Sequence, residues 1–364
     1  MSSDKLAMPR RLLVYCDSVA WRQRFLEMYA ATLVRLRDAG YLVQLPFGWE
    51  PEREDMKTAH DTNWMEDDAA AFSAPSYFPK LDLLRRRQAQ RPWLGRTLVH
   101  APLLESTQVL IRSFAFPDGT VVVADRQLSG RGRRGASWDS PSGSLAFSVQ
   151  CDLVNGVNRP LQFVQYIAGL ALIESIPDEC AEARHAAEKV LRIKWPNDIF
   201  VDGLKVAGIL CESSLFRDRC TLYVGVGVNV ANTAPTMALA RLPWAASLTR
   251  ETLLARFLVV FEHYLGLFVE QGWQASGLAA LYTARWLHHD QRVLLADSNL
   301  HGRIIGLSEQ GCLLVELDPS EKPPDTSFHA SEWVVQEDTS SQLIEIDPDV
   351  TSFDWQQGIV RRRS

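Results

Sequence analysis

The chain has 364 residues, of which 38 are Lys or Arg and 44 are Asp or Glu, so its formal net charge is −6. This length predicts two or three domains, with a core large enough to fold without disulfide or metal support. The mildly acidic balance argues against a strongly basic nucleic-acid binder. No apolar run of about 20 residues is present, which argues against a membrane-spanning helix.

Cysteine usage and the N-terminus indicate the cell compartment. None of the six cysteines belongs to a C-x-x-C pair, and scattered thiols are typical of a reducing compartment. The first eleven residues lack the apolar centre of a secretory signal. Arg10 and Arg11 are compatible with a transit peptide, but Asp4 disfavours one. We therefore expect a cytoplasmic protein, with a mitochondrial location as the alternative.

Residues 1–95 form an N-terminal extension in this interpretation. Asp17 or Ser18 is placed to cap a helix, and Gly40 to end it. The extension is a partial β-α-β unit, too short to be a domain alone, followed by a charged linker. Its apolar patterns predict a strand, a helix, a strand and a second short helix, at residues 12–15, 21–39, 41–45 and 81–90.

A different pattern, rich in short apolar runs, occupies residues 96–285. The pair Asp202-Gly203 lies between two of these runs and is typical of a tight hairpin. Strands joined by hairpins and covered by helices indicate an α+β domain with a mixed sheet. Strands are expected at residues 121–124, 145–149, 191–194, 199–201, 206–211 and 222–230, and helices at 161–176 and 252–269.

Short strands separated by turn residues predict a small β-barrel at residues 286–340, and residues 341–364 are expected to be a mostly disordered tail. The acidic charge gathers here. Residues 314–358 hold eleven acidic residues against one basic residue, a net charge of −10 that leaves +4 for everything else. The barrel strands are expected at residues 292–296, 302–307, 312–317 and 333–336.

The segment GRGRRG at residues 130–135, followed by Trp138, is the first with chemical character. Its glycines allow close approach of the backbone to a ligand. Its arginines are suited to phosphate or carboxylate. A flexible basic loop of an RNA-binding type has the same composition and is an equal alternative. The segment is not a P-loop, because no G-K-[ST] ending follows.

The segment KWPND at residues 194–198 is the second. Pro196 disfavours a helical conformation at Trp195, so Lys194 closes a strand. Asn197 and Asp198 then lie at the mouth of the next hairpin. A cation, an amide and a carboxylate at strand ends can bind a polar ligand or a metal-bound nucleotide. A turn in which Asn and Asp bond to local backbone groups explains the same pattern.

A lone lysine, Lys205, begins the apolar strand KVAGIL. A lysine at the rim of a buried cleft can stabilise a phosphate or carboxylate. A solvated lysine beside the hairpin turn is the alternative.

The segment GVGVNV at residues 225–230 has alternate glycines in a strand. Such glycines clear one face of the sheet, on which a flat ligand could lie. Close packing of a helix on that face is the alternative.

Taken together, GRGRRG with Trp138, KWPND, K-x-x-G-I-L and G-x-G-x-N resemble the biotin–protein ligases, also called holocarboxylase synthetases. The triplet EST at residues 105–107 and the pair SL at 247–248 extend the resemblance, which covers about residues 97–336. Gln108 stands where relatives frequently carry Asn. The resemblance implies a class II synthetase-like α+β ligase domain at 96–285, followed by an SH3-like barrel.

The resemblance also implies an activity in two steps. Biotin and ATP would form biotinyl-5′-AMP and pyrophosphate, with Mg²⁺ accompanying ATP. A lysine of the biotin-acceptor domain of a carboxylase would then take up biotin and release AMP. The partner would be that acceptor domain, with no nucleic acid and no membrane, and the chain would be a monomer or a homodimer.

Site residues follow from the resemblance position by position. Lys205 and Arg133 would be the catalytic cations, and no metal ligand is assigned, although Mg²⁺ would lie near Asp198. The implied biotin site consists of Ser106, Thr107, Gln127, Gly130, Arg131, Gly132, Gly208, Ile209, Gly225 and Gly227. The implied nucleotide site consists of Arg133, Trp138, Asn197, Asp198, Lys205 and Asn229.

Other functions remain open at this point. A lipoate or octanoate ligase would share the fold and the acyl-adenylate chemistry. A biotin-sensing regulator that binds nucleic acid belongs to a different class, and the strand-helix-strand pattern of residues 1–95 disfavours the helix-turn-helix that it would need.

Overall fold

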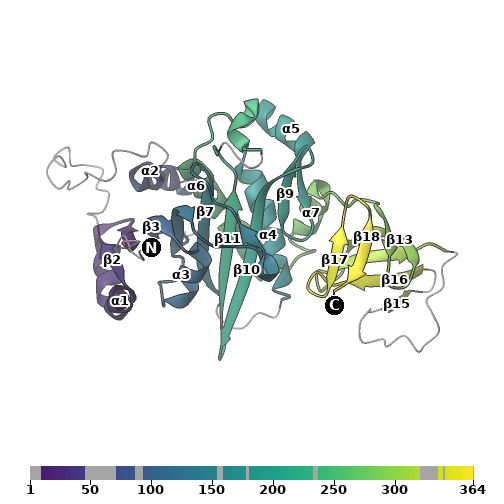
Figure 1. Ribbon diagram of the computed structural model, residues 1–364, viewed down its shortest axis with the longest axis horizontal. Helices are drawn as coiled ribbons and strands as arrows, with labels where there is room; N and C mark the ends of the chain where they lie inside the picture. Colours follow the sequence, from purple (N-terminus) through teal and green to yellow (C-terminus); the bar gives the residue numbers. More distant parts are fainter. Residues whose placement is uncertain are drawn as a thin grey trace, which may run out of the picture.

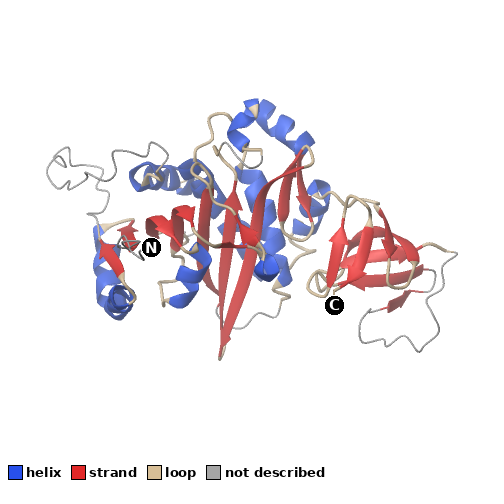
Figure 2. Cartoon of the chain, in the orientation of Figure 1, coloured by secondary structure: helices blue, strands red, loops and turns tan. Residues whose placement is uncertain are grey.

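Two large β-sheets organise the molecule (Figure 1). One has nine strands and is covered by helices, and the other has seven strands and curls on itself (Figure 2). This computed structural model describes residues 10–45, 71–86, 93–153, 159–177, 180–232, 237–319, 335–338 and 341–363. The expected α+β class, with a mixed sheet and a small C-terminal barrel-like sheet, is confirmed.

The nine-stranded sheet has the order β2-β1-β3-β4-β7-β11-β10-β9-β8. The pairs β1/β2 and β3/β4 are parallel and the other neighbours are antiparallel. Its strands are β1 (Arg10–Cys16), β2 (Tyr41–Gln44), β3 (Thr97–Leu104), β4 (Val121–Gln127), β7 (Leu145–Leu153), β8 (Leu191–Lys194), β9 (Asp198–Val201), β10 (Leu204–Phe216) and β11 (Arg219–Val228). The helices are α1 (Val19–Asp38), α2 (Ala74–Arg85), α3 (Thr107–Ser113), α4 (Gln162–Ser175), α5 (Ala181–Val190), α6 (Arg250–Gln271) and α7 (Leu278–Arg285).

The predicted strand-helix-strand unit at the N-terminus is present, and it extends the large sheet. The side chain of Ser18 accepts a hydrogen bond from the Trp21 amide at the start of α1. Strand β1 pairs with β3, and the Trp21 indole donates to Thr97 Oγ1 at 2.9 Å. The extension is therefore one edge of the nine-stranded sheet.

The helix expected at residues 81–90 lies elsewhere. Helix α2 begins at Ala74, and Ser73 caps it by accepting from the Ser76 amide. It ends at Arg85, while residues 87–90 lie outside the described residues. The reason is burial, because Tyr77 and Leu81 on α2 are fully buried and the helix packs against α6.

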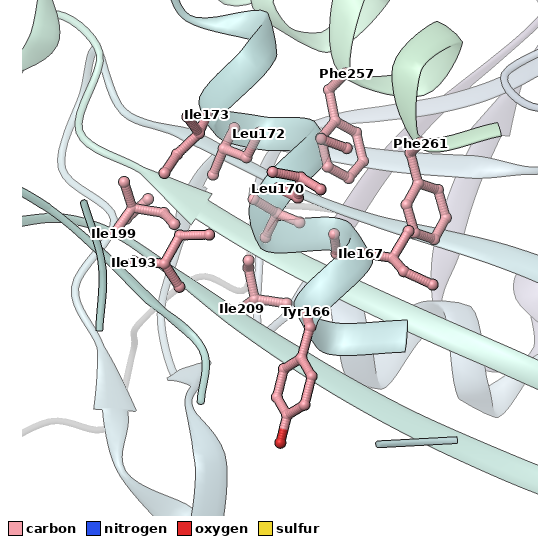
Figure 3. Packing of buried hydrophobic residues seen from close by; sticks show 14 of the residues in the cluster. Tyr166, Ile167, Leu170, Leu172, Ile173, Ile193, Ile199, Ile209, Phe257 and Phe261 are labelled. Atoms are coloured by element: carbon pink, nitrogen blue, oxygen red, sulfur yellow. The ribbon is translucent and has the colours of Figure 1, made fainter. Parts of the chain in front are cut away.

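The main core lies between the sheet and the helices α4 and α6. Helix α4 is buried along almost its whole length, and Ile193, Ile199 and Ile209 of the sheet point toward it (Figure 3). Phe257 and Phe261 of α6 reach the same cluster with stacked rings 5.4 Å apart.

Helix α6 is long and apolar enough to cross a membrane by length and composition alone. Leu253, Phe257 and Phe268 on this helix are nevertheless buried against the protein's own core. The apolar side of this helix is thus a packing face.

The Asp202-Gly203 turn forms as predicted. Both residues have positive φ, 47° and 79°, which is the backbone of a type I′ hairpin turn. Val201 pairs with Leu204 across it, so the turn fixes the register of β9 against β10.

The C-terminal sheet corrects one prediction. Residues 341–364 were expected to be a tail, yet β16, β17 and β18 belong to the sheet, and β18 pairs with β12 (Figure 1). Ile344 and Ile346 are buried in this sheet. Burial of these apolar side chains stabilises the sheet despite the high acidic charge of the segment. The sheet therefore extends from residue 292 to 362. Its strands are β12 (Arg292–Leu295), β13 (Leu300–Leu307), β14 (Leu313–Leu317), β15 (Val335–Asp338), β16 (Ser341–Ile346), β17 (Thr351–Asp354) and β18 (Ile359–Arg362).

A buried charged cluster ties β3, β4 and α6 together. Asp125 accepts hydrogen bonds from the Arg250 guanidinium at 3.0 Å and from the Phe72 amide at 2.7 Å, and it lies 2.8 Å from His100 Nε2. Burial alone would raise the pKa of Asp125. The hydrogen bond and charge of His100, together with Arg250, outweigh burial and hold that pKa below its ordinary value.

Removing Arg250 should destabilise the fold, because Asp125 would keep its charge in a buried place with one partner fewer. We expect Arg250→Ala to lower the free energy of unfolding by about 3–5 kcal/mol. The matched control is Arg303→Ala, which breaks an ion pair with Asp290 on the surface, and it should cost less than about 1 kcal/mol. Urea denaturation measures both, and equal losses would contradict the assigned role.

Candidate active site

A cavity of about 550 Å³ opens where the large sheet faces the C-terminal sheet. It brings together all the site residues predicted from the sequence except Gly130 and Asn229. Its walls come from the start of α3, strands β7, β10 and β11, the segment 131–138, and the turn between β8 and β9.

A polar network forms one wall of the cavity. Gln127 Oε1 accepts from the Thr107 amide at 2.8 Å, and Gln127 Nε2 donates to Ser140. The Thr107 hydroxyl shares a hydrogen bond of 2.9 Å with Ser148. These groups are neutral donors and acceptors held in fixed orientations.

The same wall has one buried hydroxyl without a partner. Ser106 is 2% exposed, lines the cavity, and its Oγ makes no hydrogen bond. Buried hydroxyls are normally paired, so this oxygen is available to a ligand.

Two further members of this network were not predicted as site residues. Ser148 donates to Gln108 Oε1 at 2.8 Å, and Gln108 Nε2 donates to Glu212 at 2.9 Å. Gln108 had been noted only as a departure from relatives. It supplies the acceptor that orients Ser148, a relation between β7 and α3 that sequence spacing does not reveal.

The glycine-arginine segment folds back on itself as a two-stranded ribbon. Strand β5 (Gly130–Arg131) pairs with β6 (Ser137–Trp138) across the short helix η1 (Arg133–Gly135). Gly130 lies at this pairing, where a Cβ would come within 2.4 Å of the Trp138 carbonyl. Its role is therefore to let the ribbon close, and it does not line the cavity.

The glycines of β10 and β11 leave part of one sheet face without side chains of its own. Other side chains occupy that space in this structure. A Cβ on Gly227 would lie 2.3 Å from the Trp138 indole, and one on Gly208 would lie 3.2 Å from the same ring. A Cβ on Gly225 would lie 2.7 Å from Gln108 Oε1. The glycines thus make room for Trp138 and Gln108, and the expected flat group on this face is the protein's own indole.

The Trp138 ring lies between glycine backbone and a cation. Lys205 Nζ is 5.5 Å from the ring centroid, a cation–π arrangement. The indole Nε1 is buried and makes no hydrogen bond.

Lys205 and Asp198 form the central ion pair of the cavity, with Nζ 2.7 Å from Oδ1. Lys194 lies on the other side of the same carboxylate, with Nζ 3.9 Å from Oδ2. Burial lowers the pKa of Lys194, the nearby charge of Lys205 lowers it further, and Asp198 opposes both. One carboxylate between two ammonium groups leaves positive charge for an anionic ligand.

Asn197 serves mainly its own backbone surroundings. Its Nδ2 donates to the Ile209 carbonyl at 2.7 Å, and the Ile209 amide donates to the Asn197 carbonyl at 3.0 Å. Its amide nitrogen thus bonds to backbone of the neighbouring strand β10 instead of to its own turn, while its Oδ1 faces Arg133 at 3.5 Å.

Asn229 lies outside the lining of the cavity. It is 5% exposed, and its Oδ1 accepts from Asn232 at 3.2 Å. Its amide donates to the Val206 carbonyl, so it closes the end of β11 against the start of β10.

The C-terminal sheet supplies part of the cavity that the sequence analysis missed. Arg133 donates to Asp349 at 2.7 Å and to the Pro348 carbonyl at 3.3 Å. Arg134 donates to the Thr351 carbonyl, and Arg363 also lines the cavity. The acidic C-terminal segment thus meets the basic loop, a contact whose only sequence signal was opposite charge.

A magnesium site made by the chain alone does not fit these residues. Within the described part of the chain, no group of three His, Cys, Asp or Glu side chains could hold a metal ion. Asp198 is already engaged by Lys205 and Lys194. Magnesium commonly relies on substrate phosphates for its protein sites, so phosphate oxygens would have to supply most of its ligands.

Comparison with known proteins decides the family. A family model described as "Biotin/lipoate A/B protein ligase family" matches residues 101–229. "Biotin--protein ligase 2" of Arabidopsis thaliana is 33% identical over 83% of this chain and 85% of its own length. The chain belongs to the biotin–protein ligase family. It is therefore an enzyme, and the resemblance found in its motifs is confirmed.

A second relative agrees with that family. "Biotin--protein ligase 1, chloroplastic" of Arabidopsis thaliana is 35% identical over 74% of this chain and 70% of its own length. Among solved structures, the biotin protein ligase from Aquifex aeolicus in complex with biotin and ATP has a TM-score of 0.49 at 28% identity, covering 60% of this chain and 90% of that chain.

A buried histidine under the KWPND turn predicts a pH-dependent stability. His288 Nε2 accepts from the Trp195 amide at 3.0 Å, and burial lowers the pKa of His288 to about 4. In the unfolded chain the value is about 6.5, so between these values the unfolded chain binds the extra proton. The free energy of unfolding should therefore fall as pH falls from about 6.5 toward 4.

The His288→Gln variant should lose this component, so its stability should fall less between pH 7 and pH 5 than that of the wild type. His289→Gln is the control, because His289 is the exposed neighbour. Urea denaturation at the two pH values measures the difference. An unchanged pH dependence in His288→Gln would contradict the assignment.

Proposed function

We propose that the chain joins biotin to ATP as biotinyl-5′-AMP and then transfers biotin to a lysine of a carboxylase acceptor domain. The observation that carries this proposal is one cavity lined by both neutral hydrogen-bonding groups and clustered cations. Biotin has a neutral ring system and an anionic tail. The nucleotide adds further negative charge at its phosphates.

The neutral wall suits the ureido ring of biotin. Ser106 Oγ is unpaired, and Thr107 and Gln127 are held by their own hydrogen bonds. A small polar heterocycle binds best to such fixed neutral groups in an otherwise apolar pocket. Ile209, Gly225 and Gly132 also line the cavity and would complete the walls around the ligand.

The cations suit the first chemical step. A carboxylate oxygen of biotin attacks the α-phosphorus of ATP, a new O–P bond forms, and the bond to pyrophosphate breaks. Negative charge gathers on the phosphoryl oxygens in the transition state. Lys205 and Arg133, which line the cavity, would stabilise that charge, and fixed charges of this kind need little reorganisation during the reaction.

The second step uses the same mixed anhydride. The neutral amine of the acceptor lysine attacks the biotinyl carbonyl carbon, an amide bond forms, the bond to AMP breaks, and the amine releases a proton. The oxyanion formed at that carbon needs the same cations. Burial of the anhydride in the cavity would keep water from competing with the lysine.

Residues around Lys205 would contact the nucleotide. Trp138, Asn197 and Asp198 line the cavity beside Lys205, whereas Asn229 would act only through the strand end that it closes. Arg131 adds a further cation. Mg²⁺ would supply additional charge neutralisation at the phosphates, with Asp198 as the nearest carboxylate.

Lys205→Ala should abolish most adenylate formation and keep the fold, because Lys205 lies at the rim with 38% of its side chain exposed. We expect a loss of about 100-fold to 1000-fold in the rate of biotin-dependent ATP–pyrophosphate exchange. Lys189→Ala is the control, since Lys189 is an exposed residue of α5. A Lys205→Ala variant with wild-type exchange would contradict the catalytic assignment.

A lipoate or octanoate ligase remains the alternative within the matched family. Transfer of labelled biotin to an acceptor domain separates the two functions, with unlabelled lipoate as competitor. Biotin labelling that lipoate leaves unchanged supports the proposed function. Labelling that micromolar lipoate abolishes would favour the alternative.

A further inference from the structure

The KWPND turn is held by Trp195, whose two N–H groups reach different elements. Its backbone amide donates to His288 Nε2 at 3.0 Å, and its indole Nε1 donates to the Tyr166 hydroxyl at 2.9 Å. Trp195 is 2% exposed. Both bonds therefore lie inside the protein, where water does not compete with them.

Tyr166 connects Trp195 to the C-terminal sheet. Its hydroxyl donates to the Gly311 carbonyl at 2.6 Å, in the turn between β13 and β14. A phenol has one proton to donate and lone pairs to accept with, and Tyr166 uses both functions. The hydrogen bonds thus run in one direction, from the Trp195 indole through the Tyr166 hydroxyl to Gly311.

The position of Tyr166 explains why this link is well defined. It is fully buried on α4, and its hydroxyl points away from the isoleucine cluster that the rest of the helix contacts (Figure 3). The ring packs against Tyr282 with centroids 5.1 Å apart and against Phe163 at 5.7 Å. The ring is therefore fixed by packing, and only its hydroxyl links the three segments.

Residues on both sides of Trp195 line the cavity, among them Lys194, Asn197 and Asp198. Asn197 is bonded to the Ile209 backbone, and Asp198 pairs with Lys205. The turn is thus attached at Trp195 to His288, to α4 and through Tyr166 to the C-terminal sheet, and at Asn197 to β10. Losing the Tyr166 contact would let Lys194 and Asp198 shift relative to Lys205.

We propose that Tyr166 is a positioning residue for the nucleotide part of the site. It acts through Trp195, and it makes the geometry of Lys194 and Asp198 depend on the docking of the C-terminal sheet. This proposal rests on the proposed function. Biotin contacts at Ser106, Thr107 and Gln127 lie on other elements and do not depend on the link.

The neighbouring Tyr282 offers a matched control. It is also fully buried in the same aromatic cluster, but its hydroxyl makes no hydrogen bond. Tyr166→Phe and Tyr282→Phe therefore remove the same atom from nearly the same surroundings. Only the first removes the link between Trp195 and Gly311.

The test uses the full chain and biotin-dependent ATP–pyrophosphate exchange, with biotin affinity measured separately by calorimetry without nucleotide. Tyr166→Phe should raise the KM for ATP about tenfold, equivalent to about 1.4 kcal/mol. Its biotin Kd should stay within about twofold of the wild-type value, a difference of under 0.5 kcal/mol. Tyr282→Phe should leave both values unchanged.

A second variant breaks the link at Trp195. Trp195→Phe removes the indole donor, and combining it with Tyr166→Phe should add little to the KM for ATP, because both changes break one chain of bonds. The Trp195→Phe variant on its own also decides the matter if Tyr166→Phe proves unstable. A Trp195→Phe variant with wild-type KM for ATP overturns the proposal.

The outcomes separate this proposal from the proposed function. If the wild type exchanges pyrophosphate and Tyr166→Phe behaves like Tyr282→Phe, the positioning role is overturned and the function stands. Equal losses of ATP and biotin affinity in Tyr166→Phe would also overturn the positioning role, because they would indicate a general loosening of the fold. A folded wild type that gives no exchange overturns the function, and this role with it.

Discussion

Positive charge concentrated around one cavity is the constraint on which the structure depends. The cavity lining holds the cations Arg131, Arg133, Arg134, Lys194, Lys205 and Arg363, while Asp198 is the only carboxylate that lines it within the described part of the chain. Such a cluster repels itself unless anions lie between its members. Asp198 separates two lysines, and Asp349 reaches across from the C-terminal sheet to Arg133. What remains uncompensated is available to carboxylate and phosphate.

The large sheet and the C-terminal sheet meet at this cavity, and they contribute different groups to it. The large sheet provides rigid strand ends for Lys194, Asp198 and Lys205, fixed by the Asp202-Gly203 turn. The C-terminal sheet provides anionic and carbonyl partners for the arginine loop. A loop rich in glycine and arginine has no core of its own, so these contacts hold it in place.

Much of this arrangement was predictable, because local signals were strong. Turn chemistry predicts the hairpin at Asp202-Gly203. Strand periodicity places Lys194 and Asp198 at neighbouring strand ends. The C-terminal strands were missed, because eleven acidic residues in 314–358 outweighed the short alternation that buries Ile344 and Ile346. The side chain that packs over each strand glycine could not be predicted from the sequence either. Which side chain fills the space above Gly227 or Gly225 depends on residues 89 and 117 positions away, Trp138 and Gln108.

The most direct test of the central claim is to incubate the wild-type chain with biotin, ATP and Mg²⁺ and to detect the product by mass spectrometry. The cation cluster and the neutral wall predict biotinyl-5′-AMP bound to the protein, with pyrophosphate released in equal amount. A folded chain that binds both substrates and forms no adenylate would contradict the account.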